Sequence, residues 1–168
     1  MTTTWIIDPS GSSVGFAVKQ LGVATVRGEF HKFEGAIEIG QDVASSRVYG
    51  TVMAASVDTK NERRDEHLRS ADFLDAARHP ELHFRSRRIE TVADDAVRIL
   101  GDLDLHGERR ELVLDARVVD RERLALEVTG KLSRRDYGVR WDAALGGLDA
   151  LVGDTVTLEL DIAAVRKD

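Results

Sequence analysis

Asp65 and His67 lie in a charged stretch and could in principle act as an acid–base pair. Imidazole and carboxylate groups exchange protons near neutral pH when they are held within hydrogen-bond reach. Residues two positions apart on a helix do not share a face, however, so this pair is poorly placed to work together. We therefore interpret Asp65, with its neighbour Arg64, as an anchor for a helix rather than as a catalytic group.

His79 and His83 are four residues apart, a spacing at which two imidazoles on one helix can bind a zinc ion. Pro80 lies between them and breaks the helix that would bring the two rings together. The chain contains no cysteine, which excludes disulfides, thiolate metal ligands and cysteine nucleophiles. We predict no metal site and no required cofactor.

A third polar group, Arg134, Arg135 and Asp136, directly precedes Tyr137. Its simplest interpretation is a set of ion pairs at the surface or at an interface. The sequence has no nucleophile elbow, no metalloprotease motif, no phosphate loop and no dinucleotide fingerprint. These observations predict a protein that is not an enzyme and has no catalytic residues.

The composition is that of one folded domain spanning residues 1–168, with 42% hydrophobic and 32% charged residues. The formal net charge of −6 disfavours nucleic acid as a partner, because phosphates are bound by clustered Lys and Arg. No run reaches the roughly 18 apolar residues of a spanning helix, so we expect no integral membrane segment. The first residues show no basic leader and no apolar run, so we expect a cytoplasmic protein.

Most of the chain alternates between apolar and polar residues with a period of two, which is typical of strands with one buried and one exposed face. The alternation predicts an all-β fold of about eight or nine strands, without the strand–helix rhythm of α/β proteins. The runs lie near residues 14–18, 26–30, 33–39, 47–57, 82–86, 97–105, 112–118, 124–132 and 156–162.

One segment, residues 59–78, interrupts this alternation and is rich in charged, helix-favouring residues. Thr59 followed by Glu62 has the pattern of a capping box, which predicts a helix start. A second short helix is expected to begin at Ser70 and to end before Pro80. We expect this short helical insertion to cover one opening of the β-structure.

Eight segments of the chain, in order, match motifs of one known family. They are residues 5–9 (WIIDP), 13–19 (SVGFAVK), 26–30 (VRGEF), 33–35 (FEG), 64–75 (RDEHLRSADFLD), 79–86 (HPELHFRS), 101–107 (GDLDLHG) and 133–138 (SRRDYG). The sequence thus resembles the YceI-like family of lipocalin-like, polyisoprenoid-binding proteins. The resemblance implies an eight-stranded antiparallel β-barrel with an inserted helix and a hydrophobic interior. It also implies a homodimer and a bound isoprenoid quinone or polyprenyl lipid.

Gln20 departs from the family pattern, in which a histidine commonly follows Val-Lys. Any contact which that histidine makes with the ligand is expected to differ here. Many relatives also carry a secretory leader, and this sequence shows none at its start.

We predict non-enzymatic binding, storage or transport of a long-chain isoprenoid lipid inside the barrel. An eight-stranded barrel can hold one small ligand, and each buried methylene contributes roughly 0.8 kcal/mol to binding. The predicted ligand-binding residues are Phe16, Val18, Phe30, Phe84, Leu103, Leu112, Leu114 and Trp141.

Two alternatives remain open at this point. The barrel could be an enzyme that acts on a small apolar substrate, with His67, Asp65 or Tyr137 as acid–base groups. The barrel could instead be filled by its own side chains and act through its outer surface as a protein-interaction module, since an apolar stripe at strand spacing is core in most proteins.

Overall fold

The computed structural model describes residues 2–20, 24–139 and 152–168. Most of these residues are in β-strands, and one α-helix, α1 (Glu62–Arg69), interrupts them. The strands are β1 (Thr3–Ile7), β2 (Ser13–Gln20), β3 (Ala24–Phe30), β4 (Phe33–Ile39), β5 (Arg47–Met53), β6 (Val57–Asp58), β7 (Glu81–Ala93), β8 (Ala96–Leu105), β9 (Glu108–Asp120), β10 (Ala125–Ser133) and β11 (Val152–Arg166). Short 3-10 turns lie at Pro9–Gly11, Val43–Ser45, Ala54–Ser56 and Arg134–Tyr137.

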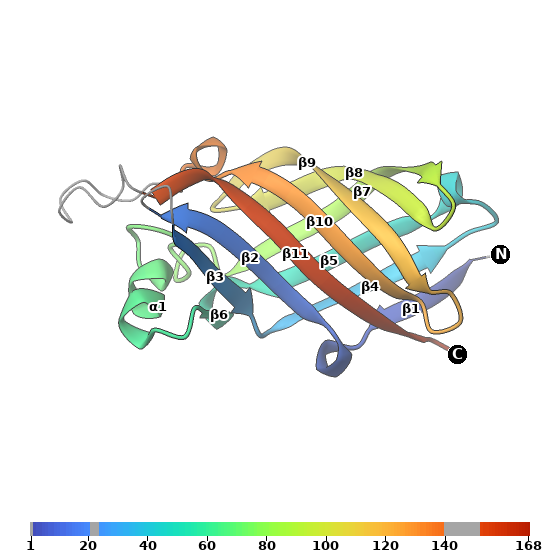
Figure 1. Cartoon of the computed structure of the whole chain (residues 1–168), viewed down its shortest axis with the longest axis horizontal. Helices are drawn as coiled ribbons and strands as arrows, with labels where there is room; N and C mark the ends of the chain where they lie inside the picture. Colours follow the sequence, from blue (N-terminus) through green and yellow to red (C-terminus); the bar gives the residue numbers. More distant parts are fainter. Residues whose placement is uncertain (1, 21–23, 140–151) are drawn as a thin grey trace.

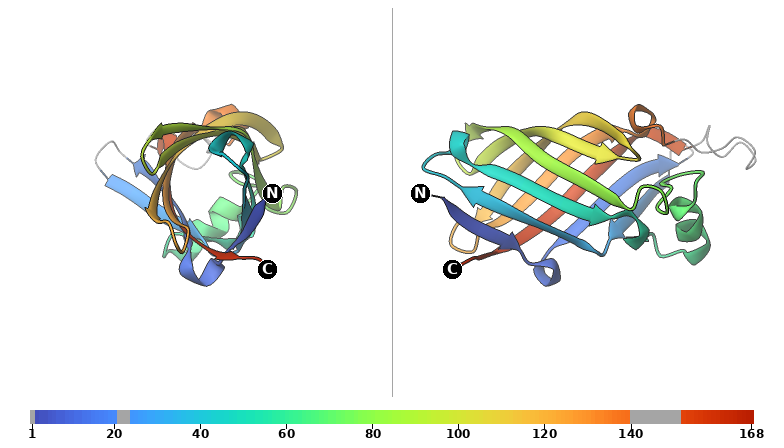
Figure 2. Two further views of the ribbon diagram at one scale, coloured as in Figure 1. Left: turned by 90° about the vertical axis from the view of Figure 1, so that its right-hand side faces the viewer. Right: turned by 180° about the vertical axis from the view of Figure 1, so that it is seen from behind.

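The strands form one closed antiparallel barrel (Figures 1 and 2). Closure depends on the long last strand, β11, which pairs with β2 through residues 152–161 and with β1 through Ala164–Arg166. β1 and β2 together occupy one position in the ring, and the pairs β3–β4 and β5–β6 each occupy another. The described segments therefore make an eight-stranded up-and-down barrel in which three strands are broken.

Two of the three breaks have a clear local cause. Between β1 and β2, the side chain of Asp8 accepts a hydrogen bond from the backbone N–H of Ser10 at 3.1 Å, and Pro9 has no N–H to give to a neighbouring strand. Between β5 and β6, the 3-10 turn Ala54–Ser56 shifts the register against the neighbouring strand. Such irregularities bend strands strongly, as a small closed barrel requires.

The sequence-based prediction of an eight-stranded antiparallel barrel with a short helical insertion is confirmed. The prediction missed β1, because Trp5, Ile6 and Ile7 are consecutive apolar residues that hide the period of two. In the structure Ile6 is 41% exposed, whereas Trp5 and Ile7 pack against the core. The separate runs predicted at residues 26–30 and 33–39 prove to be two halves of one broken strand.

The insertion differs in detail from the prediction. The cap of α1 is Asn61, whose side chain accepts a hydrogen bond from the backbone N–H of Arg64 at 3.0 Å, so the predicted capping box at Thr59 is wrong. The predicted second helix is also wrong, because the chain forms turns after Ser70. There the backbone N–H of Leu74 donates a hydrogen bond to the carbonyl of Leu68 at 2.9 Å. This turn directs the side chain of Leu74 into the core.

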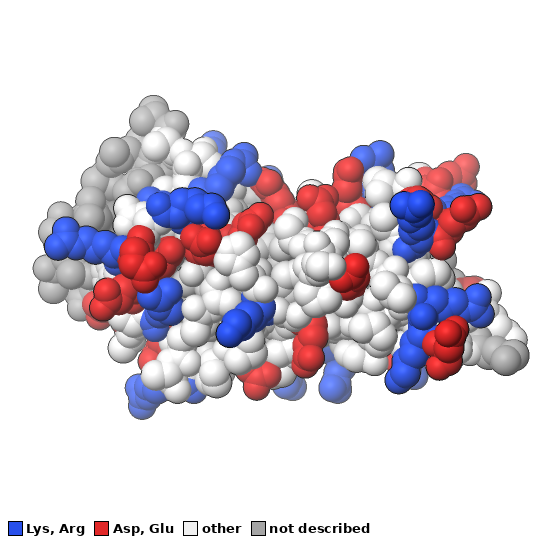
Figure 3. Space-filling view, turned by 90° about the horizontal axis from the view of Figure 1, so that it is seen from below, with Lys and Arg blue, Asp and Glu red and all other residues white. Residues whose placement is uncertain are grey.

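The insertion lies at one end of the barrel, and both chain termini lie at the other (Figure 1). On the face shown in Figure 3, acidic and basic side chains are interspersed and do not form a patch of one sign. Cross-strand ion pairs such as Arg27–Glu159 at 2.8 Å lie on the outer surface of the barrel. Among the described residues, no helix combines the length and the apolar character that crossing a membrane would need.

Candidate functional site

The interior of the barrel holds two adjoining apolar cavities. One, of about 140 Å³, lies at the end covered by the insertion, and the other, of about 180 Å³, lies deeper along the barrel. We call the two together the tunnel, because they share part of their walls. The shared residues are Phe16, Phe30, Leu82, Leu132 and Leu158.

A pair of aromatic rings marks the junction between the cavities. The ring centroids of Phe16 on β2 and Phe30 on β3 are 5.5 Å apart, with the planes tilted by 45°. Gly28 lies directly opposite Phe16 in the strand pairing. A Cβ atom on Gly28 would lie 2.5 Å from the Phe16 ring. The ring can therefore lie against the backbone of β3 only because this position is glycine.

The predicted ligand-binding residues that the structure describes all line the tunnel. Val18 borders the cavity at the insertion end, Phe16 and Phe30 border both cavities, and the others border the deeper one. These others are Phe84, Leu103, Leu112 and Leu114. Trp141 and the side chain of Gln20 lie outside the described residues.

Further tunnel residues were not predicted as part of the site. Leu158 and Leu160 on β11 line the tunnel, as does Leu132 on β10. Their alternation identified them as the buried face of a strand, and in a closed barrel that face is the interior. The alternation of apolar and polar residues along these strands was therefore enough to predict that these side chains lie in the tunnel.

The insertion supplies the wall at one end of the tunnel. Leu68 of α1 and Phe73 and Leu74 of the following turn border the cavity there, as expected for a segment that covers an opening. Leu68 and Leu74 are 7% and 8% exposed, so the insertion packs against the barrel core.

A buried polar network attaches α1 to the strand that precedes it. The backbone N–H and the hydroxyl of Thr59 donate to one carboxylate oxygen of Asp65 at 2.8 Å and 2.5 Å. Arg64 donates to the hydroxyl and the carbonyl of Thr59, each at 2.7 Å. Thr59 and Asp65 are both 4% exposed, so these bonds are shielded from water. The prediction that Arg64 and Asp65 anchor the helix agrees with these contacts.

Charged groups are concentrated at the insertion end of the tunnel. Lys19, Arg64 and Arg134 border the cavity there, whereas the wall of the deeper cavity is almost entirely apolar. Arg134 is 2% exposed and donates to the carbonyls of Gly153 and Val139, each at 3.1 Å. Arg134 is therefore buried and does not lie at the surface. The predicted surface ion pair fits Arg135, whose Nε lies 3.8 Å from Asp154.

Comparison with known proteins identifies the family. Residues 5–164 match the profile of the YceI-like domain. The chain belongs to this family. Protein YceI of Escherichia coli is 33% identical, in an alignment that covers 81% of this chain and 76% of the relative. A UPF0312 protein of Vibrio cholerae is 29% identical over 97% of this chain and 87% of its own length.

Solved structures show the same fold. BcnA of Burkholderia cenocepacia superposes with a TM-score of 0.87 at 19% identity, covering 95% of this chain and 99% of that one. A polyisoprenoid binding domain from Saccharophagus degradans superposes with a TM-score of 0.72 at 16% identity, covering 97% and 98% of the two chains. At these identities the superpositions establish the fold, a YceI-like barrel, but not the ligand.

Of the three residues considered for acid–base chemistry, Asp65 and His67 have separate partners in this YceI-like barrel. Asp65 accepts the bonds from Thr59, and His67 lies 3.4 Å from Asp72. Tyr137 is 2% exposed, and burial, assisted by the charge of Asp136, raises the pKa of its hydroxyl from 10.0 to about 12. The phenol thus keeps its proton at neutral pH and is unsuited to act as a base.

The raised pKa of Tyr137 predicts a loss of stability at alkaline pH. The folded protein binds the phenolic proton more tightly than the unfolded chain, so this contribution is fully present below pH 10. It is lost as the pH rises from 10 to about 12. Urea unfolding midpoints measured across this range should fall more steeply for the wild type than for Tyr137→Phe.

Tyr49→Phe is the matched control, because Tyr49 is 42% exposed on the outside of the barrel. This variant should follow the wild-type curve, including the changes that lysines and arginines cause at high pH. A Tyr137→Phe curve as steep as the wild-type curve would contradict the prediction.

Proposed function

We propose that this protein binds a long-chain isoprenoid lipid, of the quinone or polyprenyl class, and stores or carries it without catalysing a reaction. The observation that supports this most directly is the apolar tunnel along the barrel. Aliphatic and aromatic side chains from both the N-terminal and the C-terminal strands line it. An elongated, branched hydrocarbon suits a cavity that is longer than it is wide and almost free of polar groups.

The energetics favour a long tail over a compact ligand. Each methylene transferred from water contributes roughly 0.8 kcal/mol, so a few isoprene units filling both cavities would suffice for tight binding. The interior cavities also argue against a barrel filled completely by its own side chains. The name of the Saccharophagus degradans domain, a polyisoprenoid binding domain of the same fold, supports this choice of ligand class.

The position of the charges suggests how the ligand lies. Quinones and polyprenyl alcohols or phosphates all present hydrogen-bond acceptors at one end of an apolar chain. Among the described residues, the basic side chains that border the tunnel, Lys19, Arg64 and Arg134, all lie at its insertion end. We therefore place the polar head beneath the insertion and the tail in the deeper cavity.

Solvent extraction of the purified protein, followed by mass spectrometry, tests the proposal. We expect a prenyl lipid in stoichiometric amount, or stoichiometric uptake after incubation with quinones and polyprenols. His67→Gln should retain the lipid if the protein is a carrier, whereas an enzyme that uses His67 would convert added substrate and lose that turnover in the variant. An extract without lipid, before and after incubation, would refute the proposal.

A further inference from the structure

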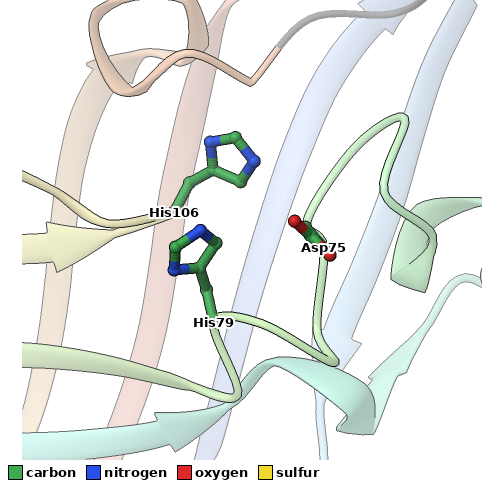
Figure 4. A group of neighbouring side chains, drawn as sticks. All are labelled: Asp75, His79 and His106. Carbon is green, nitrogen blue, oxygen red and sulfur yellow. The ribbon is translucent and has the colours of Figure 1, made fainter.

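Asp75, His79 and His106 form a cluster outside the tunnel (Figure 4). One ligand atom from each residue lies within 4.8 Å of the other two. Asp75 and His79 belong to the turn segment between α1 and β7, and His106 follows β8 at the same end of the barrel. His83 is not part of the cluster, and its Nδ1 lies 2.9 Å from the hydroxyl of Thr51.

The carboxylate of Asp75 is buried, and its ion pair is long. Its side chain is 10% exposed, and within the described chain its nearest cation is Arg78, whose Nη1 lies 3.9 Å away. No side-chain hydrogen bond reaches this carboxylate from the residues that the structure describes. A buried carboxylate is costly unless it is paired, hydrogen-bonded or bound to a metal ion.

The ring of His106 is oriented as a metal ligand requires. Its Nδ1 lies 3.0 Å from the backbone carbonyl of Tyr137, and a carbonyl only accepts hydrogen bonds. In the neutral ring Nδ1 therefore carries the proton, and Nε2 keeps its lone pair. A backbone carbonyl that holds the outer nitrogen of a histidine is a common feature of metal sites.

The local backbone brings His79 close to His106. The ring centroids of the two histidines are 5.1 Å apart. Gly107 leaves room for this approach, because a Cβ there would lie 2.8 Å from Cε1 of His79. Neither ring nitrogen of His79 has a hydrogen-bond partner among the described residues.

We propose that Asp75, His79 and His106 bind one divalent transition-metal ion of the zinc class. Two imidazole nitrogens and one carboxylate oxygen are a donor set that zinc accepts, with a fourth position left for water. Magnesium and calcium prefer oxygen ligands throughout, so the two nitrogens select against them. Binding of one ion would require side-chain rotations that draw the three atoms, now within 4.8 Å of one another, closer together.

The ion would join two parts of the barrel that are separate in sequence. Asp75 and His79 are on the segment that follows the insertion, and His106 is on the hairpin turn between β8 and β9. A metal bound only by the folded chain stabilises it by mass action. The site would therefore fasten the insertion over the end of the tunnel.

Titration of the metal-free, full-length protein with zinc chloride, followed by calorimetry, tests the site. We expect one zinc ion per chain, no comparable heat with magnesium, and a rise in melting temperature on zinc binding. Cobalt(II) should give visible absorption bands typical of nitrogen and oxygen ligands. Asp75→Asn, His79→Gln and His106→Asn should each weaken zinc binding at least about tenfold.

His106→Asn is the most informative variant. His106 and Gly107 have φ angles of 56° and 77° and form a two-residue hairpin turn, in which Asn-Gly is strongly preferred. The variant should therefore keep the fold, as circular dichroism can verify, while it loses the imidazole. His83→Gln, which changes a histidine in a surface hollow that His79 also lines, is the control and should bind zinc as the wild type does.

Two results would overturn the proposal. One is the absence of saturable zinc binding to the wild type. The other is zinc binding that His106→Asn leaves unchanged while the variant remains folded, because the ion would then be held elsewhere on the protein.

Discussion

Gly101→Ala is expected to destabilise the barrel by about 1–3 kcal/mol, the usual range for a methyl group forced into a packed interior. A Cβ atom at this position would lie 2.4 Å from the backbone carbonyl oxygen of Arg85 and 2.6 Å from the ring of Phe84. The side chain of Phe84 could rotate, but the carbonyl belongs to β7 and is part of the sheet. Relief of the clash therefore requires β7 and β8 to separate locally.

Gly50→Ala is the matched control for this prediction. Gly50 also lies in a strand that pairs with β7, and its substitution adds the same methyl group and the same restriction of the unfolded chain. Its Cβ would lie no closer than 3.2 Å to another atom, which a shift of a few tenths of an ångström can relieve. Urea unfolding should show a clearly larger loss for Gly101→Ala, and equal losses would show that the contact with Arg85 is not decisive.

The interior face of the barrel could be predicted from the sequence because successive side chains of a strand point to opposite faces. Once Leu112 and Leu114 are placed on one face, the neighbouring charged residues must be on the other. The same rule assigned Phe16, Phe84 and Leu103 to the interior face, and all three line the tunnel. The two cavities could not be predicted in this way, because the alternation does not show how completely opposite walls meet.

The polar contacts were harder to predict because they join residues that are distant in sequence. Sequence spacing suggested His79 with His83, whereas the structure places His79 beside His106. The hairpin register contains the missing signal, since His83 pairs with Asp104 and the start of β7 therefore lies beside the end of β8. A histidine just before β7 and one just after β8 are then neighbours. Only the register could reveal this, and the alternation alone does not specify it.

The insertion shows a similar limit. Its composition predicted a helix, and its place between two strands predicted a cover for one end of the barrel. The cap at Asn61 and the turns after Ser70 depend on packing against the core, where Leu68 and Leu74 are buried. Local propensity alone cannot decide between a second helix and a turn at such a site.

Leu158→Trp is expected to weaken binding of a long-chain isoprenoid about a hundredfold. Leu158 borders both cavities and lies opposite Phe16 in the strand pairing, so a larger side chain there enters the junction. An indole at the junction would exclude the lipid tail from the deeper cavity. Loss of about four buried methylene groups corresponds to about 3 kcal/mol, or roughly two factors of ten in affinity.

The control is Thr155→Trp, which adds the same ring on the exposed face of the same strand and should leave lipid binding unchanged. Affinities for a quinone with a long tail and for an analogue with a single isoprene unit should be compared. The short analogue reaches only the cavity at the insertion end, so Leu158→Trp should discriminate against the long ligand and much less against the short one.

The outcome also distinguishes the tunnel from a barrel that works through its outer surface. If Leu158→Trp remains folded and binds the long-chain lipid as tightly as the wild type does, the ligand does not occupy the junction and the tunnel is not its site. If the variant is destabilised by the 1–3 kcal/mol typical of overpacking and no form of the protein binds lipid, the interior is core and the surface must carry the function. Selective loss of the long ligand in a stable variant is the result that only a lipid tail lying through the junction explains.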